Sequence, residues 1–584
     1  MEKFREIGGV VLLFALLIAV KCYLVFYAVG VTGPTCFGDE LVYKEDAGLL
    51  FSGQLFTDIH YPPLYSLALS PAFLSGDRWY EWMLFINVLA ASAIVFPVWL
   101  ISRSLLPRPL SFVPVALSAL LPVHVVYPQM IMSENLFLPL FLFAFYFAFV
   151  RPRSVRFSGC LLGAACALAY MTKYLFLPAI PILFAVWWFV DRKKKPQLSD
   201  VATAAASFFA VYVLWLAYAH LSGIGILNAL GYRVAFGSES AKSVVPSVAG
   251  IAMWAAAYCS YFILAIAPAA GLFSLLVYNA IRKKTDVSAK EKMFLGAVVV
   301  LTVAYLAVSV QHSARASYNQ PTPSYLLGRY LMQLTPLFLI AAVLAAYKLW
   351  KTRSSISPYA ALAALIFAVL LVYSAHGTLY GQTVWKFPAW FAASTFNSID
   401  TMVYRSNVVF YGALSVVFII AALLFSSRFL RPKQRRYTLL LILLALLGFQ
   451  LVACYKGYTQ MAAQEPWPIH GRILAEFFKN DMEQGVSSIG LVNGASGVSA
   501  EQLALSLEFW GVPKSTVTVI PLGGNMAEIS GASRQYFLTG SRLGAQEALA
   551  YYVGGKRFYL YYYTDARKMQ APSACATPPS PSPS

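Results

Sequence analysis

The sequence has little charge. Only 12% of its 584 residues are Asp, Glu, Lys or Arg, and 59% are apolar, whereas an ordinary soluble domain is about 25% charged and about 45–50% apolar. The mean hydropathy is +0.65. This composition excludes a disordered protein, a coiled coil and a soluble multidomain enzyme. It indicates a polytopic membrane protein that is long enough for a dozen or more spans and a further domain.

Paired cysteines and acidic residues are also scarce. The seven Cys residues are scattered, none forms a CxxC pair, and most lie in apolar runs, which argues against a zinc cage and a disulfide framework.

The 44 Lys and Arg outnumber the 25 Asp and Glu, for a net charge of +19. In a soluble protein this excess would suggest nucleic acid. In a membrane protein the basic residues gather in cytoplasmic loops, so we expect a lipid bilayer and no nucleic acid as partner.

Apolar runs predict thirteen membrane-spanning helices, since about 20 apolar residues cross a bilayer. The first run follows MEKFRE and continues past Lys21 without a small-residue cleavage site, which favours an uncleaved span over a signal peptide. The third and fifth runs are short. The thirteen ranges are 8–30, 82–102, 110–128, 131–150, 157–172, 174–190, 201–221, 249–281, 293–310, 328–347, 357–376, 406–427 and 437–455.

Loop charges set the predicted orientation. With the N-terminus in the cytoplasm, 24 of the Lys and Arg residues lie in inside loops and 9 lie in outside loops between spans, as the positive-inside rule requires. Thirteen spans then place the C-terminus outside. This asymmetry favours a multi-pass protein of the bacterial plasma (inner) membrane, with a periplasmic or extracellular C-terminal domain. An archaeal or endoplasmic-reticulum membrane stays open.

Residues 456–570 change in character. Short β-like runs (SSIGLVN, TVTVIP, QYFLTG, RFYLYYY) alternate with amphipathic helical runs (GRILAEFFKND, AEQLALSLEFWG, AQEALAYYVGG). This alternation predicts a small α/β domain with a largely parallel sheet. The run VNGASG is not GxGxxG, so it predicts no dinucleotide site. Residues 571–584, which end in PPSPSPS, predict a disordered Pro/Ser tail.

The first outside loop, residues 31–81, holds seven of the 25 acidic residues. A loop of this length without an evident domain is usually functional. Asp39 and Glu40 come just after the first span. A carboxylate that is partly desolvated at the membrane surface has a raised proton affinity, which suits a general base. The alternative is a solvated pair that caps the following helix.

Three further residues lie near the same predicted surface. His60 and Tyr61 precede two prolines in IHYPPLY, which fix a rigid, non-helical turn. His60 has the chemistry to bind a metal or a phosphate, or it is an ordinary hydrogen-bonded surface residue. Glu134 begins the fourth span in MSENLFLP, where it either faces the cavity of Asp39 or forms an N-cap box with Ser133.

Two basic residues lie against the charge bias. Lys173 sits between two short spans on the outside, and Arg329 precedes the tenth span. An isolated cation at that depth needs an anion, and a lipid-linked phosphate is one such partner. Snorkelling to ordinary lipid headgroups is the alternative. Arg315 is a weaker candidate of the same kind, as are Arg233 and Arg405.

Several runs together resemble the GT-C superfamily of membrane glycosyltransferases. The similarity is closest to the branch with the protein O-mannosyltransferases and the lipid A aminoarabinose transferase. GDELVY matches the catalytic acidic motif of the family, HYPPLY its Pro-Pro-Leu element and MSENLFLPL its Ser-Glu helix start. YMTKYLFLPAIP and GRYLMQLTPLFL match its Thr-Lys and Arg-Tyr-Leu elements. The similarity is best over residues 1–350.

The resemblance implies a GT-C transmembrane catalytic domain over residues 1–455 and an inverting transferase with a polyprenyl-phosphate sugar as donor. It implies that Asp39 is the base and that Glu40 supports Asp39 or a metal. Lys173 and Arg329, with the neighbouring Tyr330 and Arg315, would bind the donor phosphate. The related enzymes carry a Glu-Lys pair just before Pro62, where this chain has His60 and Tyr61. That Glu is a metal ligand in them, so use of a divalent metal ion is left open, with His60 as the replacement ligand.

Two other functions stay open. A transporter or flippase of an anionic lipid-linked substrate is one, although such proteins show internal repeats and mid-membrane charges, and this sequence shows no evident repeat. A catalytically silent scaffold is the other. The sequence identifies neither the sugar nor the acceptor, which is a lipid, a polysaccharide or a protein.

Overall fold

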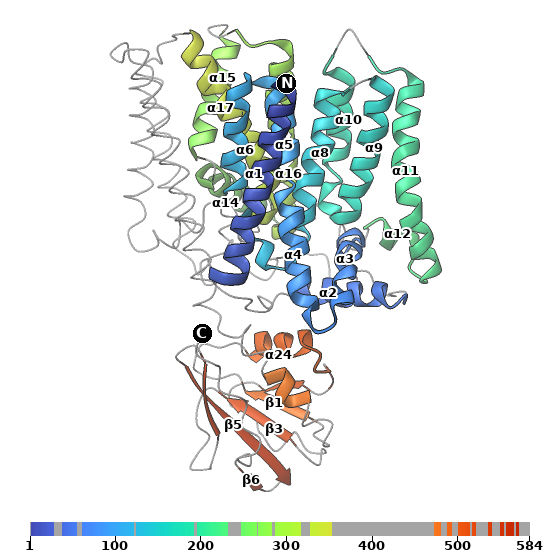
Figure 1. Cartoon of the computed structure of the whole chain (residues 1–584), viewed down its shortest axis with the longest axis vertical. Coiled ribbons are helices and arrows are strands. Elements are labelled where there is room, and N and C mark those ends of the chain that lie inside the picture. The colour runs from blue at the N-terminus through green and yellow to red at the C-terminus, as the bar shows by residue number, and fades with distance from the viewer. Residues whose placement is uncertain are drawn as a thin grey trace, which may run out of the picture.

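A computed structural model describes most of the first 352 residues and parts of the C-terminal segment (Figure 1). The predicted spans 357–376, 406–427 and 437–455 and the tail 571–584 lie outside the described residues, so the count of thirteen stays a prediction. The described ranges are 2–28, 38–54, 61–121, 124–125, 127–152, 154–191, 195–231, 247–265, 267–282, 286–316, 328–352, 472, 474–479, 488–492, 500–513, 515, 517–520, 535–539, 549–553, 556–565 and 568–570.

Helices form the N-terminal part, and their long axes run roughly side by side in Figure 1. The α-helices are α1 (Glu2–Cys22), α2 (Gly38–Phe51), α3 (Leu64–Leu69), α4 (Trp79–Ser92), α5 (Val95–Leu105), α6 (Phe112–Ala119), α8 (Glu134–Val150), α9 (Val155–Thr172), α10 (Ala179–Phe189), α11 (Leu198–Leu221), α12 (Ile226–Ala229), α14 (Val248–Ala265), α15 (Ala267–Ile281), α16 (Ala289–Ala316) and α17 (Thr335–Thr352). A π-helical turn, η1 (Tyr23–Ala28), extends α1. The 3₁₀ turns are η2 (Ser70–Arg78), η3 (Arg108–Ser111), η4 (Tyr127–Gln129), η5 (Tyr174–Phe176), η6 (Gly328–Tyr330) and η7 (Met332–Leu334).

Five helical segments among the described residues are long and apolar enough to cross a bilayer. The segments are Glu6–Tyr27, Leu64–Leu105, Val155–Thr172, Leu198–Leu221 and Ala289–Ala314. On α11 the apolar side chains of Phe209, Leu214 and Leu221 are exposed, as expected of a surface that faces lipid rather than water. The protein is therefore a multi-pass membrane protein.

Prolines divide two of the predicted spans. The range 82–102 is α4 and α5, joined by a turn at Ala93 and Ile94. Pro97 cannot donate a hydrogen bond to the carbonyl of Ala93, which instead accepts from the backbone of Phe96 at 3.2 Å. The range 249–281, predicted as one span, is α14 followed by α15. Pro268 lies in the first turn of α15, a position where proline starts a helix and does not continue one.

Two helices of the bundle, α9 and α11, approach each other closely because Gly163 has no side chain. A Cβ atom at this position would lie 2.0 Å from the backbone oxygen of Ala204. Aromatic side chains fill the interior beside this pair. Phe137, Phe141 and Phe145 on α8 are fully buried, and their four-residue spacing places them on one helix face.

The described strands of the C-terminal segment form one mixed sheet. They are β1 (Ser488–Val492), β2 (Val517–Ile520), β3 (Gln535–Thr539), β4 (Leu549–Val553), β5 (Lys556–Asp565) and β6 (Lys568–Gln570). The order is β2-β1-β3-β5-β4, with β6 paired to β5. β1 pairs with β2 and β3 in parallel, whereas the β3–β5, β4–β5 and β5–β6 pairs are antiparallel. The helix α24 (Ala500–Phe509) contacts β1 and β2.

Two predictions for this segment were wrong. The sheet was expected to be largely parallel, and three of its five strand pairs are antiparallel. The run AQEALAYYVGG was expected to be helical, but its second half is β4. Tyr and Val favour a strand, and the Gly-Gly sequence before β5 is typical of a two-residue hairpin. The boundaries 456–570 of the predicted domain stay a prediction.

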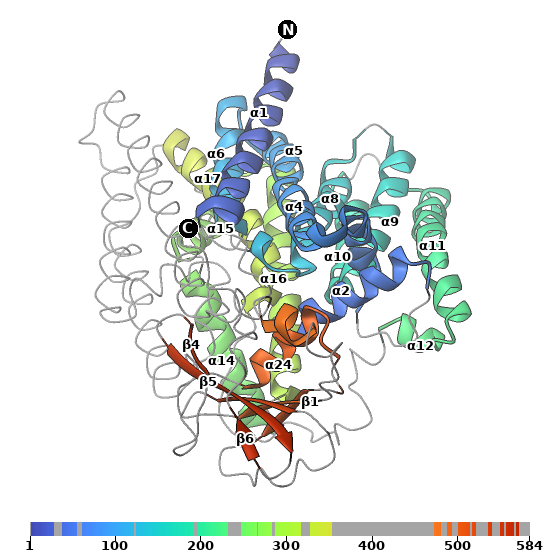
Figure 2. The same cartoon turned by 60° about the horizontal axis from the view of Figure 1, so that its bottom comes forward.

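A cluster of aromatic side chains, which we call the aromatic clamp, joins the C-terminal segment to the helices. It consists of Trp79, Tyr80, Phe509 and Trp510, whose ring centroids lie 5.4–5.7 Å apart. Arg472 adds an ion pair with Glu81 at 3.3 Å, and its guanidinium lies 5.1 Å from the Trp510 ring. α24 also contacts α2, and the two helices lie side by side in both Figure 1 and Figure 2.

Candidate active site

The acidic pair Asp39–Glu40 lies in the first turn of α2, where the partial positive charge of a helix N-terminus favours carboxylates. Glu40 is fully buried. Its Oε1 accepts a hydrogen bond from the backbone N–H of Ile131 at 2.9 Å. This bond ties the start of α2 to the segment that leads into α8, and it fixes the position from which Asp39 projects.

Both carboxylate oxygens of Asp39 are engaged. The hydroxyl of Tyr61 donates to Oδ1 at 2.6 Å, and Nη1 of Arg329 donates to Oδ2 at 2.8 Å. The Asp39 side chain is only 22% exposed. The alternative of a solvated acidic pair therefore does not describe Asp39, which lies in an ion pair with a residue 290 positions away in the sequence.

A second ion pair adjoins the first. Nζ of Lys173 donates to Oε1 of Glu134, whose side chain is 1% exposed. The same Oε1 lies 4.0 Å from Nε of Arg329, so Arg329 stands between the two carboxylates. Glu134 begins α8, Lys173 follows α9 and Arg329 lies in η6. We call Asp39, Glu134, Lys173 and Arg329 the charge cluster.

Aromatic rings border the charge cluster. The Lys173 ammonium lies 5.6 Å from the ring centroid of Tyr330 and 5.9 Å from that of Phe137. The Arg329 guanidinium lies 5.8 Å from the Tyr330 ring. Such contacts favour the charged form of a cation that is shielded from water. The Tyr330 ring therefore borders both cations, and its predicted role in binding the donor phosphate stays a prediction.

The pKa values follow from this burial and pairing. Burial alone would raise the pKa of Asp39, but the charge of Arg329 and the hydrogen bonds from Tyr61 and Arg329 outweigh it, so the pKa lies below the ordinary 3.8. Burial lowers the pKa of Lys173 below the ordinary 10.5, although Glu134 opposes the shift. Burial also raises the pKa of Tyr61, as does the charge of Asp39. Asp39 is thus an anion at neutral pH.

Sequence reasoning missed a polar network behind the cluster. Tyr43 packs between Tyr61 and Tyr65, with ring centroids 4.9 and 4.8 Å apart. The Tyr65 hydroxyl donates to Oδ1 of Asn87 at 2.7 Å, and Nδ2 of Asn87 donates to the carbonyl of Met130 at 2.8 Å. The available signal was Asn87 itself, because a buried asparagine in an apolar helix needs hydrogen-bond partners.

Other predicted site residues have different outcomes. His60 lies outside the described residues. Arg315 lies in the last turn of α16, and its side chain is not among those described. The alternative of an N-cap box at Ser133 was wrong, since the side chain of Ser133 makes no capping hydrogen bond to α8.

The described residues do not fit a metal site. No group of three or more His, Cys, Asp and Glu residues gathers anywhere in the described ranges. The carboxylates of Asp39 and Glu134 already face Arg329 and Lys173, whose charges oppose the approach of a divalent cation. Because His60 is not described, its role as a metal ligand stays a prediction.

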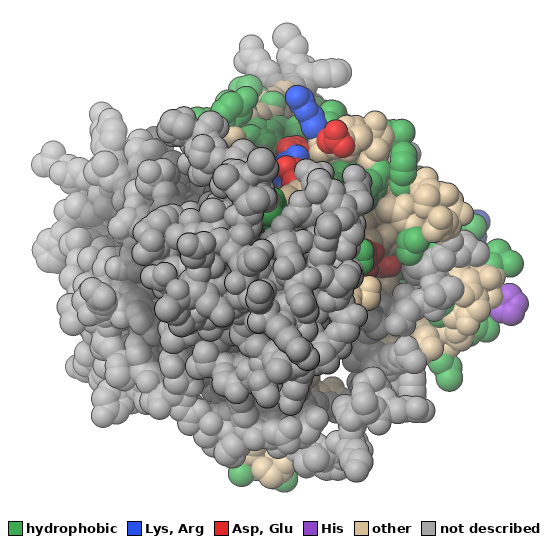
Figure 3. Space-filling view, turned by 90° about the horizontal axis from the view of Figure 1, so that it is seen from below, with side chains coloured by type: hydrophobic (Ala, Val, Ile, Leu, Met, Phe, Trp, Pro, Cys, Tyr) green, Lys and Arg blue, Asp and Glu red, His purple; other side chains and the backbone are tan. Residues whose placement is uncertain are grey.

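The cluster has two chemical capacities. Lys173 and Arg329 supply adjacent N–H donors and positive charge for an anion such as a phosphate. Asp39 supplies a carboxylate that is held in one orientation by Tyr61. Figure 3 shows the molecule from the end nearest α2 and α24, where acidic and basic side chains lie next to one another among hydrophobic ones.

Comparisons with known proteins bear on the fold. No family model matches the sequence, and no curated protein matches it. ArnT from Cupriavidus metallidurans bound to undecaprenyl phosphate is similar in structure, with a TM-score of 0.54, 13% identity, and coverage of 94% of this chain and 97% of that chain. Its apo state gives a TM-score of 0.51 and 14% identity over the same shares.

The oligosaccharyltransferase of Archaeoglobus fulgidus in the apo form is more distant. Its TM-score is 0.44 and its identity 11%, with 88% of this chain and 64% of that chain covered. The likeness to ArnT over nearly the whole of both chains bears out the expected fold: the chain has the multi-pass fold of ArnT.

Proposed function

We propose that this protein is a membrane glycosyltransferase that moves a sugar from a polyprenyl phosphate to an acceptor hydroxyl at the outer face of the membrane. The observation that carries the proposal is the charge cluster, in which Arg329 links the carboxylates of Asp39 and Glu134. The ArnT fold supports it, since one of the similar structures contains undecaprenyl phosphate.

The phosphate of the sugar donor would bind to Lys173 and Arg329. The free cluster holds two cations and two carboxylates, so the phosphodiester of the donor brings a third anion. When the bond between the anomeric carbon and the phosphate oxygen breaks, the polyprenyl phosphate that leaves gains one negative charge. Fixed cations at that position stabilise the charge as it develops.

Asp39 would act as the base in an inverting reaction. The acceptor oxygen attacks the anomeric carbon on the face opposite the phosphate, and Asp39 takes the acceptor proton. In the free protein Arg329 lowers the proton affinity of Asp39. When the donor phosphate draws Arg329 away, burial dominates and the pKa of Asp39 rises. Donor binding therefore activates the base.

The neighbouring residues would position these groups. Tyr61 orients the carboxylate of Asp39 through the bond to Oδ1, and Glu40 anchors the first turn of α2 to the backbone of Ile131. Glu134 holds Lys173 in the protonated form before the donor arrives. Tyr330 covers both cations and keeps water from them.

The test uses purified protein, polyprenyl-phosphate sugars and native membrane extract, with mass spectrometry of the products. We expect Asp39→Asn to lower the transfer rate at least about 100-fold, since a positioned base contributes about 10²–10⁴ in rate. Glu45→Gln is the matched control because Glu45 is an exposed acid on the same helix. Full transfer by Asp39→Asn would refute the assignment of the base. Donor movement across vesicles without any sugar transfer would favour a transporter.

A further inference from the structure

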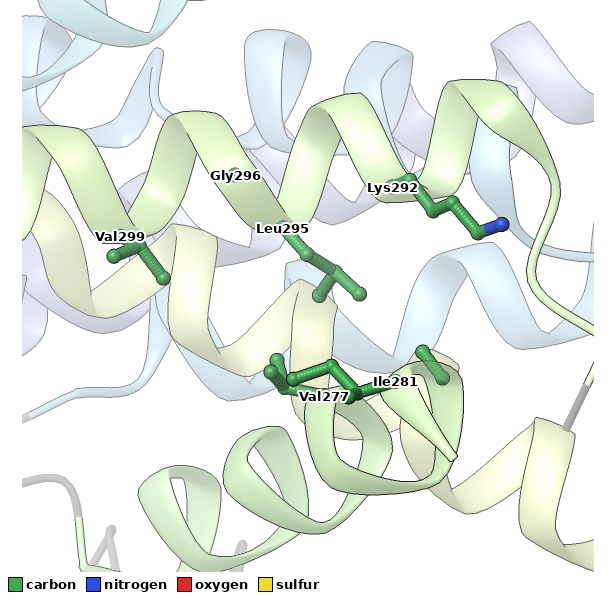
Figure 4. Close-up of a pocket in the computed structure, with 7 residues that line it drawn as sticks. Val277, Ile281, Lys292, Leu295, Gly296 and Val299 are labelled. Atoms are coloured by element: carbon green, nitrogen blue, oxygen red, sulfur yellow. The ribbon is translucent and has the colours of Figure 1, made fainter. Parts of the chain in front are cut away.

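A groove between α15 and α16 has no part in the proposed reaction. Val277, Ala280 and Ile281 line it from α15, and Lys292, Leu295, Gly296 and Val299 line it from α16. Its volume is about 340 Å³, within the range of about 300–1,000 Å³ typical of small-molecule sites. Figure 4 shows the apolar side chains of the two helices converging on this groove.

Gly296 keeps the groove open. A Cβ atom at this position would meet no other atom within 4 Å, so a larger side chain there would occupy the groove without a clash. The apolar rim continues along the surface, since Ile281 and Val299 are 75% and 42% exposed and Val303, one turn further on α16, is 62% exposed. Because α16 is one of the segments long and apolar enough to cross a bilayer, such an exposed apolar surface on it faces acyl chains.

A cation stands at one end of the groove. Lys292 extends away from the apolar side chains toward the end of the helix pair (Figure 4), and its side-chain ammonium makes no hydrogen bond or ion pair with the part of the chain that is described. Its neighbour Lys348 differs, because Lys348 pairs with Glu291 at 2.9 Å and donates to the carbonyl of Asp286 at 3.0 Å. Lys292 thus presents its charge to the groove opening.

The surrounding surface is basic as well. Arg282 follows α15 and Lys290 lies in the first turn of α16, and the sequence between the helices contains the run RKKTD. Cationic pockets between transmembrane helices recognise acidic lipid headgroups, with an apolar channel for the acyl chains. A zwitterionic lipid brings its own positive charge to the phosphate and gains less from these side chains.

We propose that this groove binds an acidic phospholipid, with an acyl chain along Gly296 and Leu295 and the phosphate at Lys292. The site is separate from the charge cluster: Figure 1 places the end of α15 near the N-terminus of the chain and α2 at the opposite end of the bundle. The groove therefore binds a lipid of one leaflet, whereas the proposed sugar donor lies in the opposite leaflet. Lipid binding in the groove does not depend on the proposed reaction.

The experiment measures the lipid that stays bound to the purified full-length protein by native mass spectrometry, during titration with phosphatidylglycerol or phosphatidylcholine. We expect the wild type to prefer phosphatidylglycerol. Lys292→Gln should weaken that binding about five-fold, the contribution of about one basic residue at an anionic surface. Lys351→Gln, which removes an exposed cation of the same end of the bundle outside the groove, should change it less than two-fold.

A second variant tests the acyl chain. Gly296→Phe should weaken both lipids more than about ten-fold, because excluding even two methylene groups has that effect. Gly8→Phe is the control, since Gly8 also has open space around its Cβ position. Equal binding of the two lipids by the wild type, or equal phosphatidylglycerol binding by Lys292→Gln and Lys351→Gln, would overturn the proposal. Retention of phosphatidylglycerol by Arg329→Gln would show that the two sites are independent, and loss of it there would overturn the assignment to this groove.

Discussion

Arg329→Gln removes the cation that stands between the two carboxylates of the charge cluster. Arg329 lies 2.8 Å from Asp39 and 4.0 Å from Glu134, and its side chain is 15% exposed. Loss of one partner of a buried ion pair costs about 3–5 kcal/mol in the free energy of unfolding. Asp39 keeps the hydrogen bond from Tyr61 and is 22% exposed, so we expect the free energy of unfolding to fall by about 3 kcal/mol.

Affinity for the sugar donor should fall together with stability. A hydrogen bond between a cation and an anion contributes about 1.5–3 kcal/mol, so losing the bond from Arg329 to the phosphate weakens binding by about 10- to 150-fold. The measurement is equilibrium binding of a polyprenyl-phosphate sugar to purified protein. Arg315→Gln, at a weaker candidate for the same role, should reduce the affinity less, and equal donor affinities in the two variants would refute the role of Arg329. Arg329→Lys, which keeps the charge, should recover part of the affinity.

Arg329→Gln should also shift the pH dependence of the transfer rate. In the wild type the pKa of Asp39 is below 3.8, so the ion pair with Arg329 stabilises the fold above about pH 4 and is lost as the pH falls through the lowered pKa. Without Arg329 burial raises the pKa of Asp39. We therefore expect the transfer rate of Arg329→Gln, measured from pH 4 to 8 at sub-saturating donor so that it reports the free protein, to decline on acidification at a higher pH than the wild-type rate. Coincident profiles would contradict this.

Two further substitutions test the cation and the packing. Because burial lowers the pKa of Lys173 below 10.5, the donor affinity of the wild type should fall as the pH rises, before pH 10.5 is reached. Lys173→Arg should abolish this fall, since arginine stays charged. A binding titration in which the affinity of Lys173→Arg falls at the same pH as that of the wild type would contradict this. Gly163→Ala places a Cβ 2.0 Å from the backbone oxygen of Ala204 and should destabilise the protein by about 1–3 kcal/mol. The loss of stability is measured by thermal unfolding, with Gly8→Ala as the control because the space at Gly8 is open. Equal unfolding midpoints of the two variants would mean that α9 and α11 are not packed as described.

Much of the site could be predicted from the sequence because charge is rare in it. Asp39 stood out in an acidic pair just after the first apolar run, and Glu134, Lys173 and Arg329 stood out as charges at the ends of apolar runs. The structure brings these four together. Their pairing could not be predicted. Hydropathy places residues near a membrane surface but does not say which of two cations meets which carboxylate across loops distant in sequence. The catalytic roles of these residues stay a prediction.

Other features depend on contacts that no local pattern reveals. Glu40 was expected to assist Asp39 or a metal, yet it bonds to the backbone of Ile131, an interaction set by how α2 meets the segment before α8. The strand β4 was mistaken for a helix because the run that contains it begins with AQEALA, whose residues favour a helix, whereas pairing with β5 decides the outcome. Pro97 and Pro268 were visible in the sequence, and more weight on proline would have located both helix breaks.

The aromatic clamp restricts how parts of this protein can be exchanged with those of proteins of similar fold. Trp79 and Tyr80 belong to the helical part, Phe509 and Trp510 to the segment with the sheet, and the helix that carries Asp39 also touches α24. A chimera that exchanges the C-terminal third must therefore bring matching rings on both sides of the junction, together with the Arg472–Glu81 pair. A graft without them would leave an apolar surface exposed to water near α2, the helix that carries Asp39.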